Sequence, residues 1–353
     1  MKLDAFRSQF DLGTKILVTG HTGFKGTWLS LLLEQLGFEV CGLSLEAEPG
    51  SLFQRLNRAG KIEEKLTDIR NFSAVSSAVS SFKPKLIFHL AAQPLVLTSY
   101  DQPRETFETN IMGTANILES AFSTSSVSHV SVITTDKVYK NEENGEKFKE
   151  GDPLFGKDPY SASKVGAEAA VSAWIQMKKV HDGPEVMALR AGNVIGGGDF
   201  AEYRLLPDLV RGFQKGESVE IRNPQSTRPW QHVLDPLTGY LLAAAKSNLG
   251  TQNTAFNFAP NGESLSVKKV CDIAAETWGR GAVGVHVSEN VSKLEAKALE
   301  LDASLARAEL GWSPFWTQEE AVRSTINWWK KILHESASPM QACLDDLNIV
   351  LGR

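Results

Sequence analysis

Cysteine is scarce in this chain, and its distribution excludes the common cysteine-based sites. The 353 residues include three cysteines, Cys41, Cys271 and Cys343, which lie far apart. An odd number at such separations argues against a disulfide framework, and none forms a CxxC pair of the kind that binds metal. The histidines show no ligand spacing either. We therefore expect reduced thiols, a cytoplasmic protein and no bound metal.

Long apolar runs and an excess of positive charge are also lacking. No stretch reaches the ~18 uncharged apolar residues that a membrane helix requires. Residues 1–15 carry Asp4, Arg7 and Asp11, where a signal peptide would be apolar. The formal net charge is -5, so no basic field favours nucleic acid or an anionic membrane as a partner. With 42% hydrophobic residues, the chain is not disordered either.

The first half of the chain alternates short β-branched runs with helical patterns. Such alternation with short links predicts an α/β fold, a Rossmann-type doubly wound parallel sheet. We expect strands at 15–19, 38–43, 86–90, 130–134 and 186–189, and helices at 23–36, 103–122 and 160–178.

A change of rhythm after residues 196–198 predicts a smaller C-terminal α/β lobe that binds the substrate. The length suits two lobes at ~150 residues per domain. Helices at about 205–214 and 267–278, with strands near 219–221 and 255–258, follow the change. We expect a nucleotide-binding domain at 12–190, the smaller lobe at 191–233 and 261–335, segments near 234–260 packed back on the sheet, and a C-terminal tail at 336–353.

A glycine-rich segment joins the first predicted strand to the first predicted helix with the spacing G-x-x-G-x-x-G. Glycines let the backbone approach a pyrophosphate, and a helix N-terminus offers free N–H donors. A structural turn would also use glycine, but the order strand, turn, helix favours a dinucleotide site. The candidate residues are Gly20, Thr22, Gly23, Phe24, Lys25 and Gly26.

The residues after the next strands favour NAD over NADP. Ser44 or Glu46 could reach the adenosine ribose, and no basic residue stands there for a 2′-phosphate, Arg55 being the nearest. The small residues after His89 would let a cofactor lie against the sheet or would simply pack, and His89 itself is interpreted as a core histidine. The cofactor candidates in this segment are Leu90, Ala91 and Ala92.

Tyr160 and Lys164 are one helical turn apart, so their side chains share a face. A nearby cation favours phenolate, and we expect it to lower the pKa of Tyr160. Such a pair is common by chance on exposed helices. After a nucleotide-binding unit, and with Thr135 at a strand end to orient a sugar alcohol, it predicts a dehydrogenase dyad.

Asp136 and Lys137 directly follow Thr135. Oxidation or 4-epimerisation of a sugar needs no further acid and base there, but dehydration does, because one proton is removed and a leaving hydroxyl is protonated. The alternative is a solvated charge pair in a loop.

Several segments together resemble one enzyme family over about residues 12–329. They are 20–26, 89–93, 135–137, 160–164, 190–199, 204–208, 221–224 and 228–232. The chain is similar to the extended short-chain dehydrogenase/reductases that modify nucleotide sugars, in particular the CDP-glucose 4,6-dehydratases. Asp136-Lys137 is the sharpest discriminator, since dTDP-glucose relatives have Asp-Glu there. The chain departs from the family at Leu97-Thr98, where two arginines are usual, and at Thr227, where an apolar residue is usual.

The resemblance implies NAD-dependent dehydration of CDP-glucose in bacterial deoxysugar or O-antigen precursor synthesis. It implies Tyr160 as the C4 base with Lys164 in support, Lys137 as the C5 base and Asp136 as the acid. Asp68 and Ile69, which could equally be a helix N-cap region, would contact the adenine. A homodimer, or a tetramer, would form through helices 103–122 and 160–178. The implied substrate residues are Gln93, Asn193, Arg204, Leu205, Ile221, Arg222, Asn223 and Arg228.

Three alternatives stay open from the sequence. One is a dehydratase acting on dTDP- or UDP-glucose, and another is a nucleotide-sugar 4-epimerase on the same fold. The third is a non-catalytic dinucleotide sensor, which retention of the Tyr160–Lys164 pair argues against.

Overall fold

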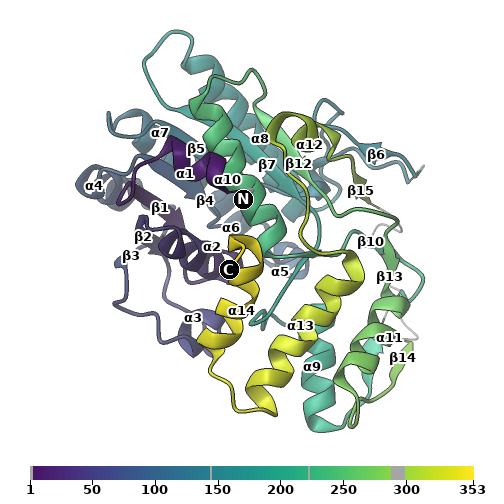
Figure 1. The fold of residues 1–353 in the computed structure, drawn as a ribbon. Helices are drawn as coiled ribbons and strands as arrows, with labels where there is room; N and C mark the ends of the chain where they lie inside the picture. Colours follow the sequence, from purple (N-terminus) through teal and green to yellow (C-terminus); the bar gives the residue numbers. More distant parts are fainter. Residues whose placement is uncertain (1–2, 144, 222, 288–298) are drawn as a thin grey trace.

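A computed structural model describes residues 3–143, 145–221, 223–287 and 299–353. Its centre is a seven-stranded parallel sheet in the order β12-β7-β5-β4-β1-β2-β3 (Figure 1). The predicted Rossmann-type sheet is therefore confirmed. The direction of strand addition reverses between β1 and β4, and in such sheets ligands bind in the crevice at that point. The strands are β1 (Lys15–Thr19), β2 (Glu39–Ser44), β3 (Glu63–Leu66), β4 (Leu86–His89), β5 (His129–Ile133), β7 (Glu185–Ala191) and β12 (Ala255–Phe258).

Helices cover both faces of the sheet. Successive residues of a strand point to opposite faces, so Ile16 and Val18 of β1 join one hydrophobic core while Leu17 joins the other. On one face lie α1 (Asp4–Gln9), α2 (Phe24–Gln35) and α10 (Leu234–Asn248), and on the other α4 (Phe72–Phe82), α7 (Gly113–Phe122) and α8 (Pro159–Met177). The short helix α1 was not predicted.

The single helix predicted at 103–122 is wrong in detail. The chain forms α5 (Val96–Asp101), α6 (Pro103–Phe107), a π-helical turn η1 (Glu108–Met112) and then α7. Asn110 of this turn donates through Nδ2 to the Ser163 hydroxyl on α8, at 2.8 Å, and accepts through Oδ1 from the Gln93 amide, at 2.8 Å. The wide turn thus joins the end of β4 to the helix that carries Tyr160, and π turns often occur at functional sites.

The second half of the chain adds a region built from helices and short strand pairs, at the lower right of Figure 1. The predicted helices there are present as α9 (Leu205–Lys215) and α11 (Val267–Trp278), with α13 (Gln318–Leu333) beside them. The strand pairs are β8 (Val194–Ile195) with β11 (Gln231–His232), β9 (Val219–Ile221) with β14 (Val285–Val287), and β10 (Thr227–Arg228) with β13 (Leu265–Ser266). The remaining elements are α3 (Leu52–Arg55), η2 (Asp136–Val138), β6 (Lys147–Phe148), β15 (Glu300–Leu301) and α12 (Ser304–Leu310).

The glycine segment 196–198 connects the sheet to this second region. The Trp28 indole on α2 donates to the Gly197 carbonyl at 3.0 Å. A Cβ at Gly197 would lie 2.0 Å from Cγ of Trp328 on α13, so a side chain cannot be accommodated there. Two tryptophans from different elements therefore hold this segment in place. The boundaries of the two lobes stay a prediction.

The C-terminal residues, to which the motifs assign no role, form a helix. Helix α14 (Pro339–Leu351) begins at Ser338, whose side chain accepts from the Gln341 amide. It packs against α13 with Cys343, Leu347 and Val350 fully buried. Burial of such an apolar face is what stabilises a helix of this length.

Candidate active site

The glycine-rich turn forms a cradle at the start of α2. Gly20 has a φ of +72°, and a Cβ there would lie 2.9 Å from Cα of Ala91. A Cβ at Gly26 would lie 2.0 Å from the Gly20 carbonyl oxygen. Helix α2 starts after Gly23 with no side chain capping its first N–H groups, so these donors can face an anion. The cradle fits the diphosphate of a dinucleotide.

The residues expected at the adenosine end lie around this cradle. The Ser44 hydroxyl, at the end of β2, is hydrogen-bonded to the Thr22 hydroxyl, and both lie within hydrogen-bonding distance of the Leu45 carbonyl, so one hydroxyl donates to the other and that one donates to the carbonyl. Asp68 is bound by the Arg70 guanidinium, whose hydrogen bonds lower the pKa of this carboxyl. Ile69 is buried. The N-cap of α4 is Asn71, so neither Asp68 nor Ile69 caps that helix.

The end of β4 closes the cradle on the other side. The Ala91 amide donates to the Thr19 hydroxyl at 3.1 Å, and Leu90 and Ala92 are half-buried beside it. His89 is hydrogen-bonded through both ring nitrogens, to Thr19 at 2.7 Å and Thr114 at 3.1 Å. Burial lowers its pKa to about 3, so the ring is neutral. It is a hydrogen-bonded core histidine, as expected.

Four of the five expected catalytic side chains come together between β5 and α8. Thr135, Asp136, Tyr160 and Lys164 are all less than a tenth exposed. The Thr135 hydroxyl donates to Asp136 Oδ1 at 2.9 Å and is also hydrogen-bonded to the Tyr160 side chain. Lys164 Nζ donates to the Ile133 carbonyl at the end of β5, at 3.2 Å. Lys137 follows in the 3-10 turn η2 and is half-buried.

Local capping explains why these groups face one another. Asp158 and Ser161 form a reciprocal capping box that starts α8 directly before Tyr160. The backbone N–H of Tyr160 donates to the Ser99 hydroxyl at 3.1 Å. Thr135 caps η2 by accepting from the Lys137 amide. The dyad is thus held at a helix start and the acid–base pair at a strand end.

The expected low pKa of Tyr160 is wrong for the protein alone. Burial raises it to about 12, and the Asp136 carboxylate adds to the rise. The Thr135 hydrogen bond and the Arg204 charge oppose this but do not outweigh it. Burial also lowers the pKa of Lys164 to about 8 and raises that of Asp136. Each shift disfavours a charged form, as desolvation requires.

Lys25 brings a charge to the site that sequence reasoning did not use. Its ammonium lies 6.0 Å from the centre of the Tyr240 ring. Burial, reinforced by the charges of Lys164 and Arg204, lowers its pKa to about 7. The sequence reasoning had treated the residue only as part of the phosphate-binding turn.

The expected substrate residues fall into two groups. Arg204 donates to Asp199 at 2.9 Å and its charge acts on Tyr160, while the charge of Arg228 acts on Asp136. Both guanidinium groups are therefore near the catalytic cluster. The other expected residues have separate surroundings. The Gln93 side chain is hydrogen-bonded to Thr106 and to the Leu95 amide, and the backbone carbonyls of Asn193 and Asn223 accept from the amides of Gln231 and Ser226. Leu205 begins α9, Ile221 is buried in the core, and Arg222 lies outside the described residues.

Glu168 and Arg190 were missed as parts of this site. They form a bidentate ion pair, both side chains 5% exposed, with nitrogen–oxygen distances of 2.8 Å. Glu168 follows Lys164 by four residues, so helical spacing places it on the face of the dyad. That spacing could have revealed it.

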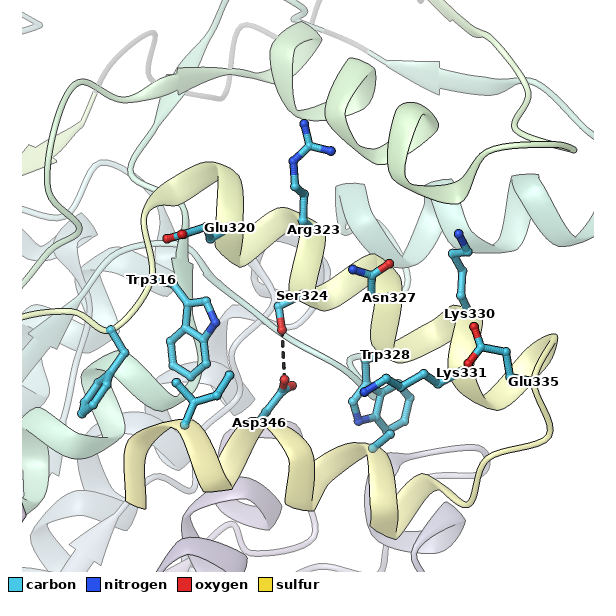
Figure 2. Close-up of a pocket in the computed structure, with 13 residues that line it drawn as sticks. Trp316, Glu320, Arg323, Ser324, Asn327, Trp328, Lys330, Lys331, Glu335 and Asp346 are labelled. Atoms are coloured by element: carbon cyan, nitrogen blue, oxygen red, sulfur yellow. Dashed lines mark hydrogen bonds between the residues drawn. The ribbon is translucent and has the colours of Figure 1, made fainter. Parts of the chain in front are cut away.

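A hollow lies away from these residues. A cavity of about 560 Å³ opens between α13 and α14, lined by Trp316, Arg323, Ser324 and Asp346 among others (Figure 2). None of the predicted site residues lines it. Within the described ranges no group of three His, Cys, Asp or Glu side chains could hold a metal. Likewise, none of the helices described is both long and apolar enough to span a membrane.

Known proteins match this chain over most of its length. The family model described as GDP-mannose 4,6 dehydratase matches residues 17–325. The CDP-glucose 4,6-dehydratase of Salmonella typhimurium (strain LT2) is 42% identical over 329 residues, 90% of this chain and 91% of its own. The 27% identical dTDP-glucose 4,6-dehydratase of Haemophilus influenzae covers 89% of this chain and 97% of its own.

A solved structure agrees with these sequence matches. TunA, described as a NAD dependent NDP-hexosamine 5,6-dehydratase, superposes with a TM-score of 0.76 at 25% identity, covering 93% of this chain and 99% of its own. The resemblance to CDP-glucose 4,6-dehydratases that the motifs indicated is confirmed by the 42% identity. The chain therefore belongs to the GDP-mannose 4,6 dehydratase family.

Proposed function

We propose that the protein is a hydro-lyase that converts CDP-D-glucose to CDP-4-dehydro-6-deoxy-D-glucose and water with NAD as its cofactor. The observation that carries the proposal is the buried cluster of Thr135, Asp136, Tyr160 and Lys164, with Lys137 adjoining it. It combines a redox dyad with the extra acid and base that dehydration requires.

The glycine cradle and the residues around it would hold NAD. The first N–H groups of α2 would bind the diphosphate, and Ser44 and Thr22 lie where a ribose would be bound. In the described part of the chain neither hydroxyl is hydrogen-bonded to a basic side chain, which supports NAD over NADP. Bound NAD would supply a hydride acceptor for C4 and, in its reduced form, a hydride donor for C6, so no second redox substrate is needed.

The tyrosine and threonine would act at the sugar 4-hydroxyl. Tyr160 takes the hydroxyl proton as hydride leaves C4, and Thr135 orients that hydroxyl. Because burial raises the pKa of Tyr160 to about 12, the phenolate needs positive charge close by. Arg204, whose charge already lowers that pKa, and Lys164, one helical turn further along α8, are the cations that would supply it.

Asp136 and Lys137 would carry out the elimination. The 4-ketone acidifies the hydrogen at C5, and Lys137 removes that proton. Asp136 protonates the 6-hydroxyl, which leaves as water, and C5 regains a proton when hydride is delivered to C6. Burial raises the pKa of Asp136, which is the direction that a general acid requires.

Arg204 and Arg228 would neutralise the diphosphate of the substrate. Arginine suits this task because its planar group can bind phosphate oxygens in pairs. We propose that Gln93, Asn193, Leu205, Ile221, Arg222 and Asn223 complete the nucleotide-sugar site.

We propose a cytoplasmic homodimer, or a tetramer, that serves bacterial deoxysugar and O-antigen precursor synthesis. All three cysteines are buried free thiols, which suits a reducing compartment. Tyr100, Phe107 and Met112 expose 40–55% of their surface around α6 and η1, beside α8. Such an apolar face suits a two-fold interface. Static light scattering at micromolar concentration tests it, and a monomer would contradict the proposal.

Product analysis with CDP-, dTDP- and UDP-glucose, each with and without NAD, tests the function. We expect a 4-keto-6-deoxy product, detected by the alkaline absorbance of the ketosugar, from CDP-glucose first. If dTDP- or UDP-glucose is preferred, the proposed substrate is wrong but the proposed reaction stands. An epimer with no ketosugar would indicate a 4-epimerase, and no product from any of them a non-catalytic dinucleotide protein.

A further inference from the structure

Helix α8 presents three ionisable side chains in successive turns. Tyr160, Lys164 and Glu168 are spaced by four residues, and their exposures are 8%, 6% and 4%. The proposed reaction uses the first two and leaves the third without a role. A buried carboxylate is costly unless it is paired and hydrogen-bonded, so its partners show what it does.

Glu168 connects α8 to the two strands that end at the site. Its Oε1 accepts from the Thr134 hydroxyl at 2.6 Å, and Thr134 directly precedes Thr135. Both carboxylate oxygens accept from Arg190, which belongs to β7. The Arg190 guanidinium is held in turn by the Tyr139 hydroxyl at 2.7 Å and the Glu150 carbonyl at 2.9 Å. The end of β5 is thereby fixed to the helix that carries the dyad.

The same carboxylate is the negative charge that acts on Lys164. Burial lowers the pKa of Lys164 to about 8, and Glu168 is the group that opposes this. The other ionisable groups facing Lys164 include His89, whose ring is neutral, and Lys25, a cation whose own pKa is about 7. Neither of them supplies a negative charge.

We propose that Glu168 is a positioning residue for the Tyr160–Lys164 pair: it keeps the Lys164 ammonium charged and, through Thr134, fixes the threonine that faces Tyr160. The role in catalysis rests on the proposed function, whereas the control of Lys164 does not. The alternative is an ion pair that only stabilises the fold.

The direct test follows the Lys164 ammonium by NMR in protein labelled with ε-13C lysine, without substrate. Its resonance is assigned by its disappearance in Lys164→Met. We expect a midpoint at about 8 in the unsubstituted protein and a midpoint about one unit lower in Glu168→Gln, because one opposite charge is lost. Glu168→Asp, which keeps the charge, should restore most of the shift. Equal midpoints for the unsubstituted protein and Glu168→Gln would overturn the proposal.

Two further variants separate this effect from loss of structure. Glu168→Gln leaves Arg190 as a buried unpaired cation, so the variant could fail to fold. The double variant Glu168→Gln/Arg190→Met removes both charges, and we expect its midpoint to be lowered by less than in Glu168→Gln, because a like charge is lost together with the opposite one. Glu34→Gln is the matched control, because Glu34 pairs with the buried Arg58 away from the site. It should leave the Lys164 midpoint unchanged.

Activity provides the second measurement. If Lys164 must be charged, the alkaline limb of the kcat/KM profile should move to lower pH in Glu168→Gln, by the same amount as the NMR midpoint. A uniform loss at every pH would indicate a purely structural role. If the unsubstituted enzyme turns over none of the nucleotide sugars, the proposed function fails while the NMR result still decides the role of Glu168.

Discussion

The buried cluster at the strand ends and the cavity between α13 and α14 differ in how far their charged side chains are exposed to water. The cavity is large, and two of its cations form exposed ion pairs: Arg323 with Glu276, and Lys331 with Asp345, each side chain more than a third exposed. At the strand ends, Lys164 and Asp136 are less than a tenth exposed and Lys25 is half-buried, and desolvation shifts the pKa of each toward its neutral form. Desolvated ionisable groups, rather than the volume of a cavity, therefore indicate the proposed site in this molecule.

Tyr160→Phe should cause the largest loss of activity among substitutions in the strand-end cluster. Only the proton-accepting oxygen is lost, so we expect kcat to fall by about 10²–10⁴-fold while NAD and nucleotide-sugar binding stay nearly unchanged. Steady-state kinetics and calorimetric titration measure the two quantities. Retention of more than roughly a tenth of the activity would show that another group is the C4 base.

Lys137→Ala should separate oxidation from dehydration. Thr135, Tyr160 and Lys164 suffice to remove hydride from C4, whereas elimination needs the base at C5. A single turnover should still produce NADH absorbance, but water loss should slow by about 10²-fold or more. Solvent deuterium should enter C5 of the product with the unsubstituted enzyme and be suppressed with the variant. If the variant dehydrates the substrate at the rate of the unsubstituted enzyme, Asp136 and Lys137 are only a charge pair in a loop.

Arg228→Ala should act on affinity, because it removes a charge from the diphosphate rather than from the reacting carbons. A charged hydrogen bond contributes about 1.5–3 kcal/mol, so KM should rise by about 10–150-fold. Lys246→Ala, which removes a cation paired with Glu309, is the control and should leave KM unchanged. A collapse of kcat at constant KM would argue for a role of Arg228 beside Asp136 instead.

Lys25→Met should reveal the cost of burying a cation. In the folded chain the pKa of Lys25 is about 7, against 10.5 for an ordinary lysine. The unfolded chain therefore binds more protons between these values, and the free energy of unfolding rises with pH across that window. The variant should be more stable at pH 6.5, by about 1–3 kcal/mol, and the difference should vanish near pH 10.5. Urea unfolding across pH measures it; a constant difference would contradict the burial argument.

Lys331→Met should have the smallest effect and thereby sharpen the comparison. An exposed ion pair contributes about 0–1 kcal/mol, so we expect little change in the midpoint of urea unfolding. Dehydration should proceed with unchanged kcat and KM. A marked loss of turnover would mean that the α13–α14 cavity takes part in the reaction after all.

Local patterns predicted much of this architecture. The strand, glycine turn and helix at 15–36 follow from spacing, and so does the shared face of Tyr160 and Lys164. The π turn at Glu108–Met112 could not be predicted, because it depends on Asn110 reaching Gln93 and Ser163. The prediction of a low pKa for Tyr160 was wrong for a related reason: burial of this side chain is set by distant segments, and burial is the largest contribution to its pKa.

The tryptophans around the glycine segment make the protein suited to spectroscopic study. Trp28 binds the Gly197 carbonyl and Trp328 packs on Gly197, while the Trp329 ring centre lies 6.0 Å from that of Phe200. Asp199, which binds Arg204, directly follows this segment. Any rearrangement of Arg204 on meeting a nucleotide diphosphate would be transmitted over one or two residues to these indoles. Intrinsic emission should thus report occupancy of the second region without any attached dye.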